Sequence, residues 1–220
     1  MAEADFVDSA DIHNQGSLVI DAAGYEVTLG TNTLAKYGGI FGGATNGLTT
    51  VAGPGKVIVN YNVDNLSGVT ASRTNAFTVA SSATLAFNPG ANIGFGALTV
   101  QNGGTLEVAE SGTVTHNGAL TLDSGAALAF NFTKRGVVPQ LALAEGSPTV
   151  SGAVTVKVSS DCGWPFSGEK ELTTCGGFDA EGVSVSLVAG APKWAKSLSV
   201  NAAGNIVLSV KPKPMLIIVR

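Results

Sequence analysis

A twelve-residue phrase recurs along this chain and limits the folds open to it. The phrase is clearest as ALTVQNGGTLEV at residues 97–108, ALTLDSGAALAF at 119–130 and AFTVASSATLAF at 76–87. Each copy contains two short runs in which every second residue is apolar, separated by a polar turn and a small residue. This period of two is typical of β-strands that bury one face. The copies begin 21 and 22 residues apart, which indicates one structural unit used repeatedly.

The repeat extends beyond these three copies. SLVIDAAGYEVT at 17–28 and SLSVNAAGNIVL at 197–208 follow the same pattern, and AVTVKVSS from residue 153 is a fainter copy. A single unit cannot fold alone, because roughly four buried apolar side chains contribute about 1.5–3 kcal/mol each. Ordering the unit's residues costs about 1–2 kcal/mol apiece. Units must therefore stack, so that each covers the apolar face of the next.

Stacking predicts an all-β chain folded as a parallel β-helix, or solenoid, with like residues aligned in columns. One inward column contains Leu85, Leu106 and Leu128, and a second contains Phe77, Leu98 and Leu120. Small residues at the corners let the chain bend where a Cβ would crowd it, and they are Ala83, Gly104 and Ala126. The alternative is an antiparallel β-sandwich, in which each phrase is a hairpin with a four-residue loop.

Composition agrees with tightly stacked strands and excludes two classes of partner. Charged residues make up only 13% of the chain, about half the usual share, and aromatic residues only 6%. The net charge of −4 and the absence of a basic cluster argue against nucleic-acid binding. No run of 18 apolar residues is present, so we expect no membrane-spanning helix.

The repeat pattern divides the chain into four parts. Residues 1–15 form a polar N-terminal cap, 16–132 the solenoid coils, 133–182 an irregular loop or cap, and 183–220 terminal β-strands. The irregular part holds both cysteines, Cys162 and Cys175, in CGWPFSGEKELTTC. Their spacing does not fit a CxxC redox or zinc motif. We expect a disulfide that closes this loop, with two independent thiols as the alternative.

One segment carries a resemblance to a known family. GPGKVIVNYNVDNLSGVT, at 53–70, resembles the G-x-G-T-L opening, the later Asn and the Ser-Gly-x-Thr of the autotransporter-associated β-strand repeat proteins, which are bacterial surface proteins. WAKSLSVNAAGNIVLSVKP is similar to the closing modules of such proteins. Lys56 departs from the family's usual Thr. The matching residues are Gly53, Gly55, Val57, Val59, Asn65, Ser67, Gly68 and Thr70.

The resemblance implies a right-handed β-helix, an extracellular or cell-surface setting, and no conventional active site. It brings no catalytic residues with it. The acidic start MAEADFVDSADIHN has no apolar segment of the kind a signal peptide needs. We therefore expect either a cytoplasmic protein or, as the repeat favours, an exported protein written here without its signal.

Because β-helices also host polysaccharide lyases and hydrolases, a cluster of carboxylates on this chain would indicate a candidate active site. Such chemistry needs two or three carboxylates, or carboxylates with Arg or Lys, on one outer face. The outward acidic residues Glu26, Glu107 and Asp123 each stand alone on a coil. The basic residues at turns are Arg73, Lys134 and Arg135. We expect solvated surface charges and no enzyme.

Histidines and metal ligands give no site either. His116 follows a strand in TVTHNG, where we expect an exposed turn residue, and His13 is the only other histidine. Asp5, Asp8 and Asp11 are spaced by three, unlike the alternating ligands of a calcium loop. The glycine-rich GGIFGGATNG lacks the Gly-Lys-Ser/Thr ending of a phosphate-binding loop. We predict no cofactor and no metal.

The candidate contact residues are then on the surface. Trp164 and Phe166 in the cysteine loop, with Trp194, are either exposed contacts or a cover for the open end of the solenoid. The apolar end of the chain could add as a strand to a neighbouring copy. That assembly strand comprises Met215, Leu216, Ile217, Ile218 and Val219.

These observations favour a non-enzymatic structural or adhesive module of a secreted or surface-displayed bacterial protein. Its expected partners are surface proteins or glycans. The alternatives are a self-assembling subunit that pairs through exposed strand edges and, more weakly, a polysaccharide lyase or hydrolase. Dividing the 220 residues by the repeat length predicts about ten coils, which at ~4.8 Å per strand give a rod roughly 50 Å long.

Overall fold

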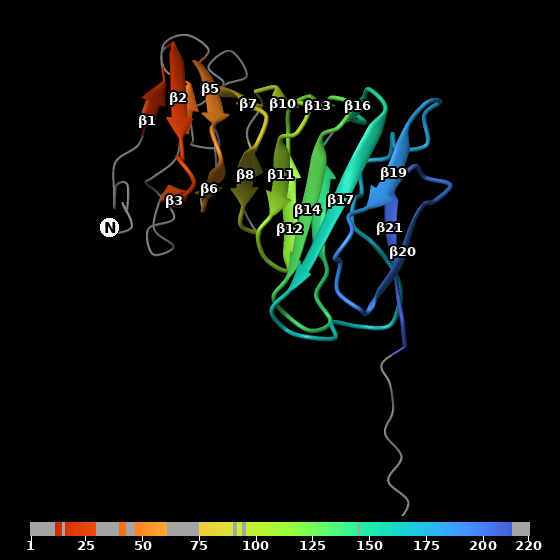
Figure 1. The fold of residues 1–220 in the computed structure, drawn as a ribbon. Helices are drawn as coiled ribbons and strands as arrows, with labels where there is room; N and C mark the ends of the chain where they lie inside the picture. The colour runs from red at the N-terminus through yellow and green to blue at the C-terminus, as the bar shows by residue number, and fades with distance from the viewer. Residues whose placement is uncertain are drawn as a thin grey trace, which may run out of the picture.

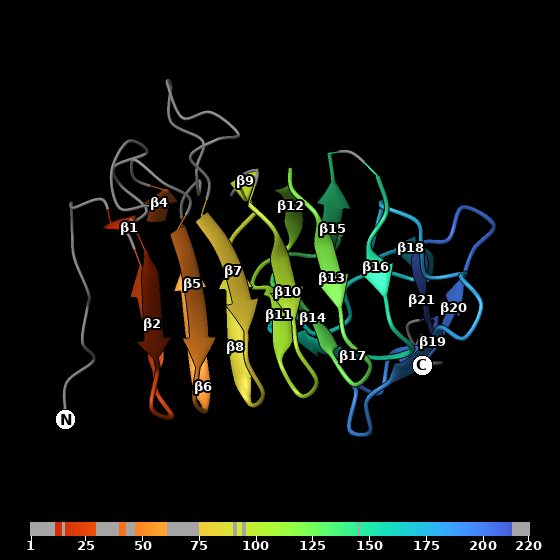
Figure 2. The ribbon, with the colours of Figure 1, turned by 90° about the horizontal axis from the view of Figure 1, so that it is seen from above.

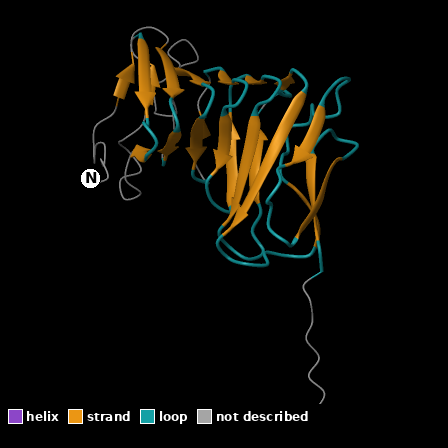
Figure 3. Ribbon diagram, in the orientation of Figure 1, coloured by secondary structure: helices purple, strands orange, loops and turns teal. Residues whose placement is uncertain are grey.

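The structure, a computed structural model, consists of strands and loops in the part of the chain that it describes, and no helix occurs there (Figure 3). For three short segments, 12–14, 40–42 and 92–93, only the backbone is described. The described residues are 12–14, 16–29, 40–42, 47–60, 75–89, 92–93, 96–144 and 146–212.

The first sheet stacks six parallel strands in chain order, and Figure 2 looks down on them side by side. Each strand belongs to a different coil, so neighbours in space are separated along the chain by the rest of a coil. The strands are β2 (Ser17–Asp21), β5 (Gly47–Ala52), β7 (Asn75–Val79), β10 (Leu98–Val100), β13 (Leu120–Leu122) and β16 (Thr149–Val150).

The second sheet stacks seven parallel strands, which lie below the first sheet in the view of Figure 1. They are β3 (Glu26–Leu29), β6 (Gly55–Val59), β8 (Ala83–Phe87), β11 (Thr105–Val108), β14 (Ala127–Phe132), β17 (Ala153–Ser160) and β19 (Ser184–Leu187).

The third sheet holds the strands that close the coils. It consists of β9 (Asn92–Ile93), β12 (Gly112–His116) and β15 (Pro139–Leu143), while β1 (Ile12–Asn14) and β4 (Ile40–Gly42) form a separate parallel pair. The chain visits the three sheets in the same order on successive coils. This is a parallel β-helix, as the repeat predicted, and the antiparallel sandwich is excluded for these coils.

The inward columns predicted from the sequence are confirmed. Leu106 pairs in register with Leu85 on one side and Leu128 on the other, and all three side chains are buried. Phe77, Leu98 and Leu120 form the second column in the same way. Because side chains alternate along each strand, fixing the interior also fixes which residues point outward.

The corner between the first and second sheets shows why small residues are needed there. A Cβ on Gly104 would lie 2.7 Å from the carbonyl oxygen of Val79. The residue directly before each corner residue has a positive φ, which glycine adopts most readily. These residues are Ser82, Gly103 and Gly125. At this corner the Gly103 N–H donates to the carbonyl of Gly125 on the next coil. The ladder between coils therefore continues through the bend.

The stack has about five turns, so the prediction of about ten coils is wrong. Coils differ in length: the aligned residues Leu18, Thr49, Phe77, Leu98 and Leu120 are 31, 28, 21 and 22 positions apart. The repeat length of 21–22 residues holds only for the two shortest coils. Longer coils carry extra residues between the second sheet and the next strand of the first.

The stack also continues into the region that the sequence assigned to an irregular cap. β15 pairs with β12, β16 with β13 and β17 with β14, all in parallel. The faint copy from residue 153 is the β17 strand, in which Val156 continues the column of Leu128. Residues 139–160 therefore complete a full coil.

The copy at 197–208 adopts a different structure from the other copies. It forms an antiparallel hairpin of β20 (Ala195–Val200) and β21 (Ile206–Val210), in which Leu198 lies opposite Leu208. The Asn201 side-chain oxygen accepts hydrogen bonds from the N–H groups of Ala203 and Asn205, closing the loop. β18 (Gly168–Glu171) pairs antiparallel with the other edge of β21. These three strands cap the C-terminal end of the stack.

We predict that the interior columns dominate stability. Leu106→Ala should lower the free energy of unfolding by about 2–5 kcal/mol, because it leaves a cavity in contact with both neighbouring coils. Leu48→Ala is the matched control: Leu48 lies on the outer side of β5 with 41% of its surface exposed. Its loss should cost less than about 1 kcal/mol. Equal midpoints for the two variants in chemical denaturation would contradict the assigned faces.

Candidate functional site

The outer side of the first sheet carries a row of threonines, one on each of five successive coils. Register pairs each threonine with the next, and a valine occupies the same position on the first coil. Parallel strands lie about 4.7–4.9 Å apart, so a hydroxyl and a methyl group recur at that interval. The row is Val19, Thr50, Thr78, Thr99, Thr121 and Thr149.

The two rows beside the threonines consist mostly of small side chains. They lie two positions before and two positions after each member of the threonine row, on the same outer side of the strands. Neither row contains an aromatic, lysine or arginine side chain. The preceding row is Ser17, Leu48, Ala76, Ala97, Ala119 and Ser147. The following row is Asp21, Ala52, Ala80, Gln101, Asp123 and Ser151.

We call these three rows the threonine face. No strand of the first sheet shows a register shift against its neighbour, so the rows continue from coil to coil along the strands that Figure 2 shows side by side. The two carboxylates, on Asp21 and Asp123, lie in one flanking row. Asp21 accepts a hydrogen bond from the N–H of Ala23, so it belongs to a turn. The face is therefore continuous, low in charge and periodic.

The outer side of the second sheet differs because long charged side chains cross it. Lys56 Nζ lies 2.9 Å from Glu107 Oε1 and 3.9 Å from Glu26 Oε2. Lys56 and Glu107 are two coils apart, and Ala86 on the coil between them is fully buried. Glu26 and Glu107 lie on separate coils as expected, and Glu26 is exposed, but the expectation that Glu107 is a solvated charge is wrong, because its side chain is only 12% exposed and pairs with Lys56.

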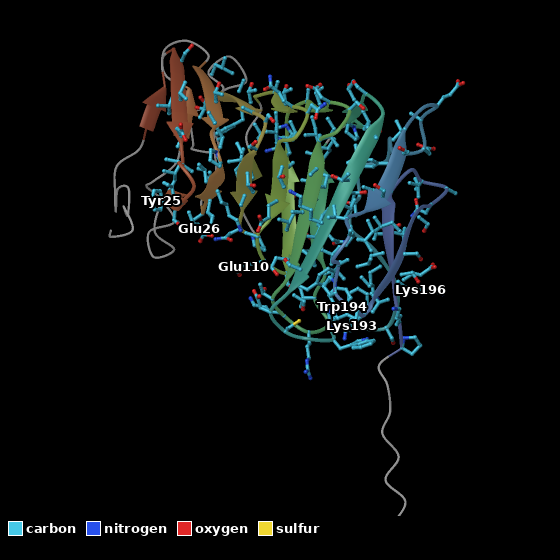
Figure 4. The ribbon with its side chains drawn as sticks, viewed as in Figure 1. Tyr25, Glu26, Glu110, Lys193, Trp194 and Lys196 are labelled. Atoms are coloured by element: carbon cyan, nitrogen blue, oxygen red, sulfur yellow. The ribbon has the colours of Figure 1, made fainter. Side chains whose placement is uncertain are left out.

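A second lysine repeats this arrangement. Lys157 Nζ lies 3.0 Å from Thr105 Oγ1, again two coils away, and the intervening coil carries Ala127 and Ala129. A small residue on the middle coil lets the lysine stem lie flat across it. Asp123 lies on a different sheet from Glu107, so these two carboxylates do not converge. In Figure 4 the labelled Glu26 and Glu110 lie away from the upper edge formed by the first sheet.

The prediction that His116 is an exposed turn residue is wrong. His116 is the last residue of β12, only 1% exposed, and its Nε2 lies 3.1 Å from the carbonyl oxygen of Ala119. Alternation along β12 points Val114 and His116 inward and Thr113 and Thr115 outward. The strand includes His116 as its last residue and does not end before it.

The three predicted contact aromatics gather at the C-terminal end of the stack. Trp194 is only 5% exposed, so its place among exposed contacts is wrong (Figure 4). The Trp194 ring packs edge-on against the Phe132 ring, with 5.3 Å between the ring centroids. The Phe166 ring also packs against Phe132, with 5.6 Å between the centroids. The half-buried Trp164 donates its indole N–H to the carbonyl of Lys211. The rings cover the open end of the core.

The predicted disulfide is also wrong, because Cys162 and Cys175 are both free thiols. Cys162 follows β17, at the corner where the chain leaves the second sheet, and its N–H donates to Phe132. Cys175 lies beyond Thr173, which bridges to Leu141 in the third sheet. Along the chain, Cys162 therefore precedes the segment that runs beside the third sheet, and Cys175 follows it.

Other predicted residues fall outside the described part of the chain. These are the assembly strand at 215–219, the acidic residues Asp5, Asp8 and Asp11, and Arg73. His13 lies in β1, where only the backbone is described. The exposed Lys134 and Arg135 precede β15, and Arg135 Nε donates to the carbonyl of Cys162.

Within the described residues, no group of three or more His, Cys, Asp or Glu side chains is arranged to hold a metal ion. The same part of the chain has no helix of the length and apolarity that a bilayer crossing requires.

Sequence reasoning missed the threonine face, although the signal was present. The three clearest copies, AFTV, ALTV and ALTL, all have threonine as the residue between their two apolar positions. An outward position of the repeat can vary without loss of burial, so the pattern of buried columns does not by itself predict a threonine there. Thr50 was further hidden by the double threonine in GLTTVA, where Thr49 takes the inward place.

Comparisons with models of protein families, with curated proteins and with solved structures give no match. The resemblance to autotransporter-associated repeat proteins therefore stays a prediction. Of its segment, 53–60 contains β6 and 61–70 lies outside the described residues.

We predict that the native protein has one reactive and one protected thiol. Burial raises the pKa of the Cys175 thiol to about 11, against a weaker opposing effect of its hydrogen bond to Thr173. Cys175 therefore stays protonated and slow to react at pH 8, since the thiolate is the nucleophile. Cys162 is more exposed. Thiol titration without reductant should count one fast-reacting thiol in the native protein and two thiols after unfolding. If no thiol reacted in either state, the two cysteines would be joined in a disulfide and this prediction would be wrong.

Proposed function

We propose that this chain is a non-enzymatic structural or adhesive module that makes its contacts through the threonine face. The observation that carries the proposal is the face itself: five threonines in register, with continuous flanking rows of mostly small side chains. Such a surface suits contact with an extended partner, because the same small groups recur along its length from coil to coil.

The stack beneath the face supports this role. The columns of Leu106 and Leu98 run through neighbouring coils without a shift in register, so the face has a closely packed base. The hairpin of β20 and β21 and the aromatic rings around Phe132 cover the C-terminal end. A rigid base lets outward side chains keep their spacing when a partner binds.

Two alternatives remain proposals of lower rank. Self-assembly through residues 215–219 rests on a segment outside the described residues. A polysaccharide lyase or hydrolase needs converging carboxylates, and the described pair Glu26 and Glu107 lies on either side of Lys56, which contacts both.

A secreted or surface-displayed setting belongs to the same proposal. It rests on the resemblance of 53–70 to bacterial surface repeats and on the low share of charged residues. The free state of Cys162 and Cys175 gives it no further support, because a disulfide would have indicated an oxidising compartment.

The test is a sedimentation assay with insoluble particles, namely cellulose, chitin and whole bacterial cells, together with a measurement of reducing-sugar release. We expect the protein to sediment with at least one kind of particle and to release no sugar. Thr99→Tyr should reduce sedimentation, because a ring that projects above the small side chains of the face separates it from an extended partner.

Thr115→Tyr is the matched control for this assay. Thr115 belongs to the same coil as Thr99 and is likewise half-buried and outward, but it lies on the third sheet. It should sediment as the unchanged protein does. Sugar release by the unchanged protein would contradict the non-enzymatic role, and equal loss in both variants would contradict the face.

A further inference from the structure

We propose that the threonine face binds the surface of ice. This inference rests on the proposed function, because it names the partner of the same face. Three properties of the face support ice as the partner: the spacing of the threonines, the chemistry that they present, and the poor fit of other partners.

The spacing of the threonine row is close to one repeat of the ice lattice. Adjacent strands place Thr78, Thr99 and Thr121 about 4.7–4.9 Å apart along the stack. Water molecules in hexagonal ice repeat along the crystal's a axis at an interval only a few tenths of an ångström shorter. Outward residues within one strand, such as Ala97 and Thr99, are about 6.6 Å apart. The face therefore offers a two-dimensional array whose rows follow one repeat of the ice lattice over five coils.

The threonine side chains present groups that suit ordered water. Each threonine has a hydroxyl, which donates and accepts hydrogen bonds as a lattice water does, and a methyl group, around which water is orientationally restricted. The β-branched side chain has few χ1 rotamers on a strand, so both groups are ordered before binding. A lysine or arginine would hold its own hydration shell, and none occurs in the three rows. Little order is lost on contact with a solid lattice.

A second copy of the chain fits the face less well. Six strands at ~4.8 Å and about five residues at ~3.3 Å give roughly 24 by 13 Å, or about 300 Å². A stable protein interface buries about 800 Å² on each partner. The face is therefore too small to hold a lasting dimer, whereas adsorption to a growing crystal needs only a match to its repeat.

Polysaccharides and nucleic acids also fit poorly. Sugar rings are usually bound on aromatic platforms beside a few placed polar groups, and no aromatic side chain lies in the three rows. Nucleic acid needs a basic surface, and the charges present on this face are the carboxylates of Asp21 and Asp123.

The test is ice partitioning. Fluorescently labelled protein is mixed with a differently labelled globular protein that ice excludes, and a single ice hemisphere is grown slowly from the solution. We expect the chain to be enriched in the ice over the excluded protein. Thr99→Tyr should lower that enrichment about tenfold, because the ring exceeds the reach of a hydrogen bond between face and lattice. Thr115→Tyr, on the third sheet of the same coil, should leave it unchanged.

Two further variants separate shape from hydrogen bonding. Thr99→Val keeps two methyl-sized branches and should retain most of the enrichment, whereas Thr99→Ser loses the methyl group and should retain less. Circular dichroism and thermal unfolding show that each variant is folded. Exclusion of the unchanged protein from ice, or an equal loss in Thr99→Tyr and Thr115→Tyr, would overturn the proposal. If ice excludes the protein but Thr99→Tyr still reduces sedimentation with particles, the adhesive function stands and ice is not its partner.

Discussion

The parallel backbone ladder between coils is the constraint on which the rest of the structure depends. It fixes the register of each strand against the next, so one residue on one coil sets the environment of its counterparts. Leu106 is buried because Leu85 and Leu128 lie on either side of it, and Thr99 faces outward for the same reason of register. Interior columns and outer rows are two consequences of one periodicity. A one-residue slip would exchange them along the whole face.

The ladder also explains how one phrase gives two structures. At the corner of residues 101–104, backbone groups pair with the next coil, as the Gly103 N–H does with Gly125. At 201–205 the turn closes on itself through Asn201, and the two halves of the phrase pair with each other. The alternation of apolar residues is compatible with both outcomes. Which one forms depends on whether a neighbouring coil is present to accept the corner's hydrogen bonds, and the phrase itself does not encode that.

This dependence sets how much could be predicted. The fold class and the two inward columns followed from aligned residues, because burial repeats with the coil. The number of coils did not follow, since coil length varies where no column constrains it. His116 points inward because β12 extends as far as this residue. Cys162 and Cys175 are not bonded, because the chain passes beside the third sheet between them. Both are tertiary facts that local spacing does not contain. The threonine row was readable, yet it needed the register of Thr50 to become a continuous face.

The contrast between the two long sheets argues that the threonine face is more than a by-product of folding. Both sheets stack on the same ladder, so both could carry any soluble outer residue. The second sheet uses this freedom in a common way: Lys56 and Lys157 reach over alanines, and Glu107 pairs with one of them. The first sheet instead repeats threonine on five coils and places its two carboxylates in a flanking row. Stability of the stack requires neither choice, because the columns beneath are equally buried. This uniform row is the feature on which the proposal of a periodic partner rests.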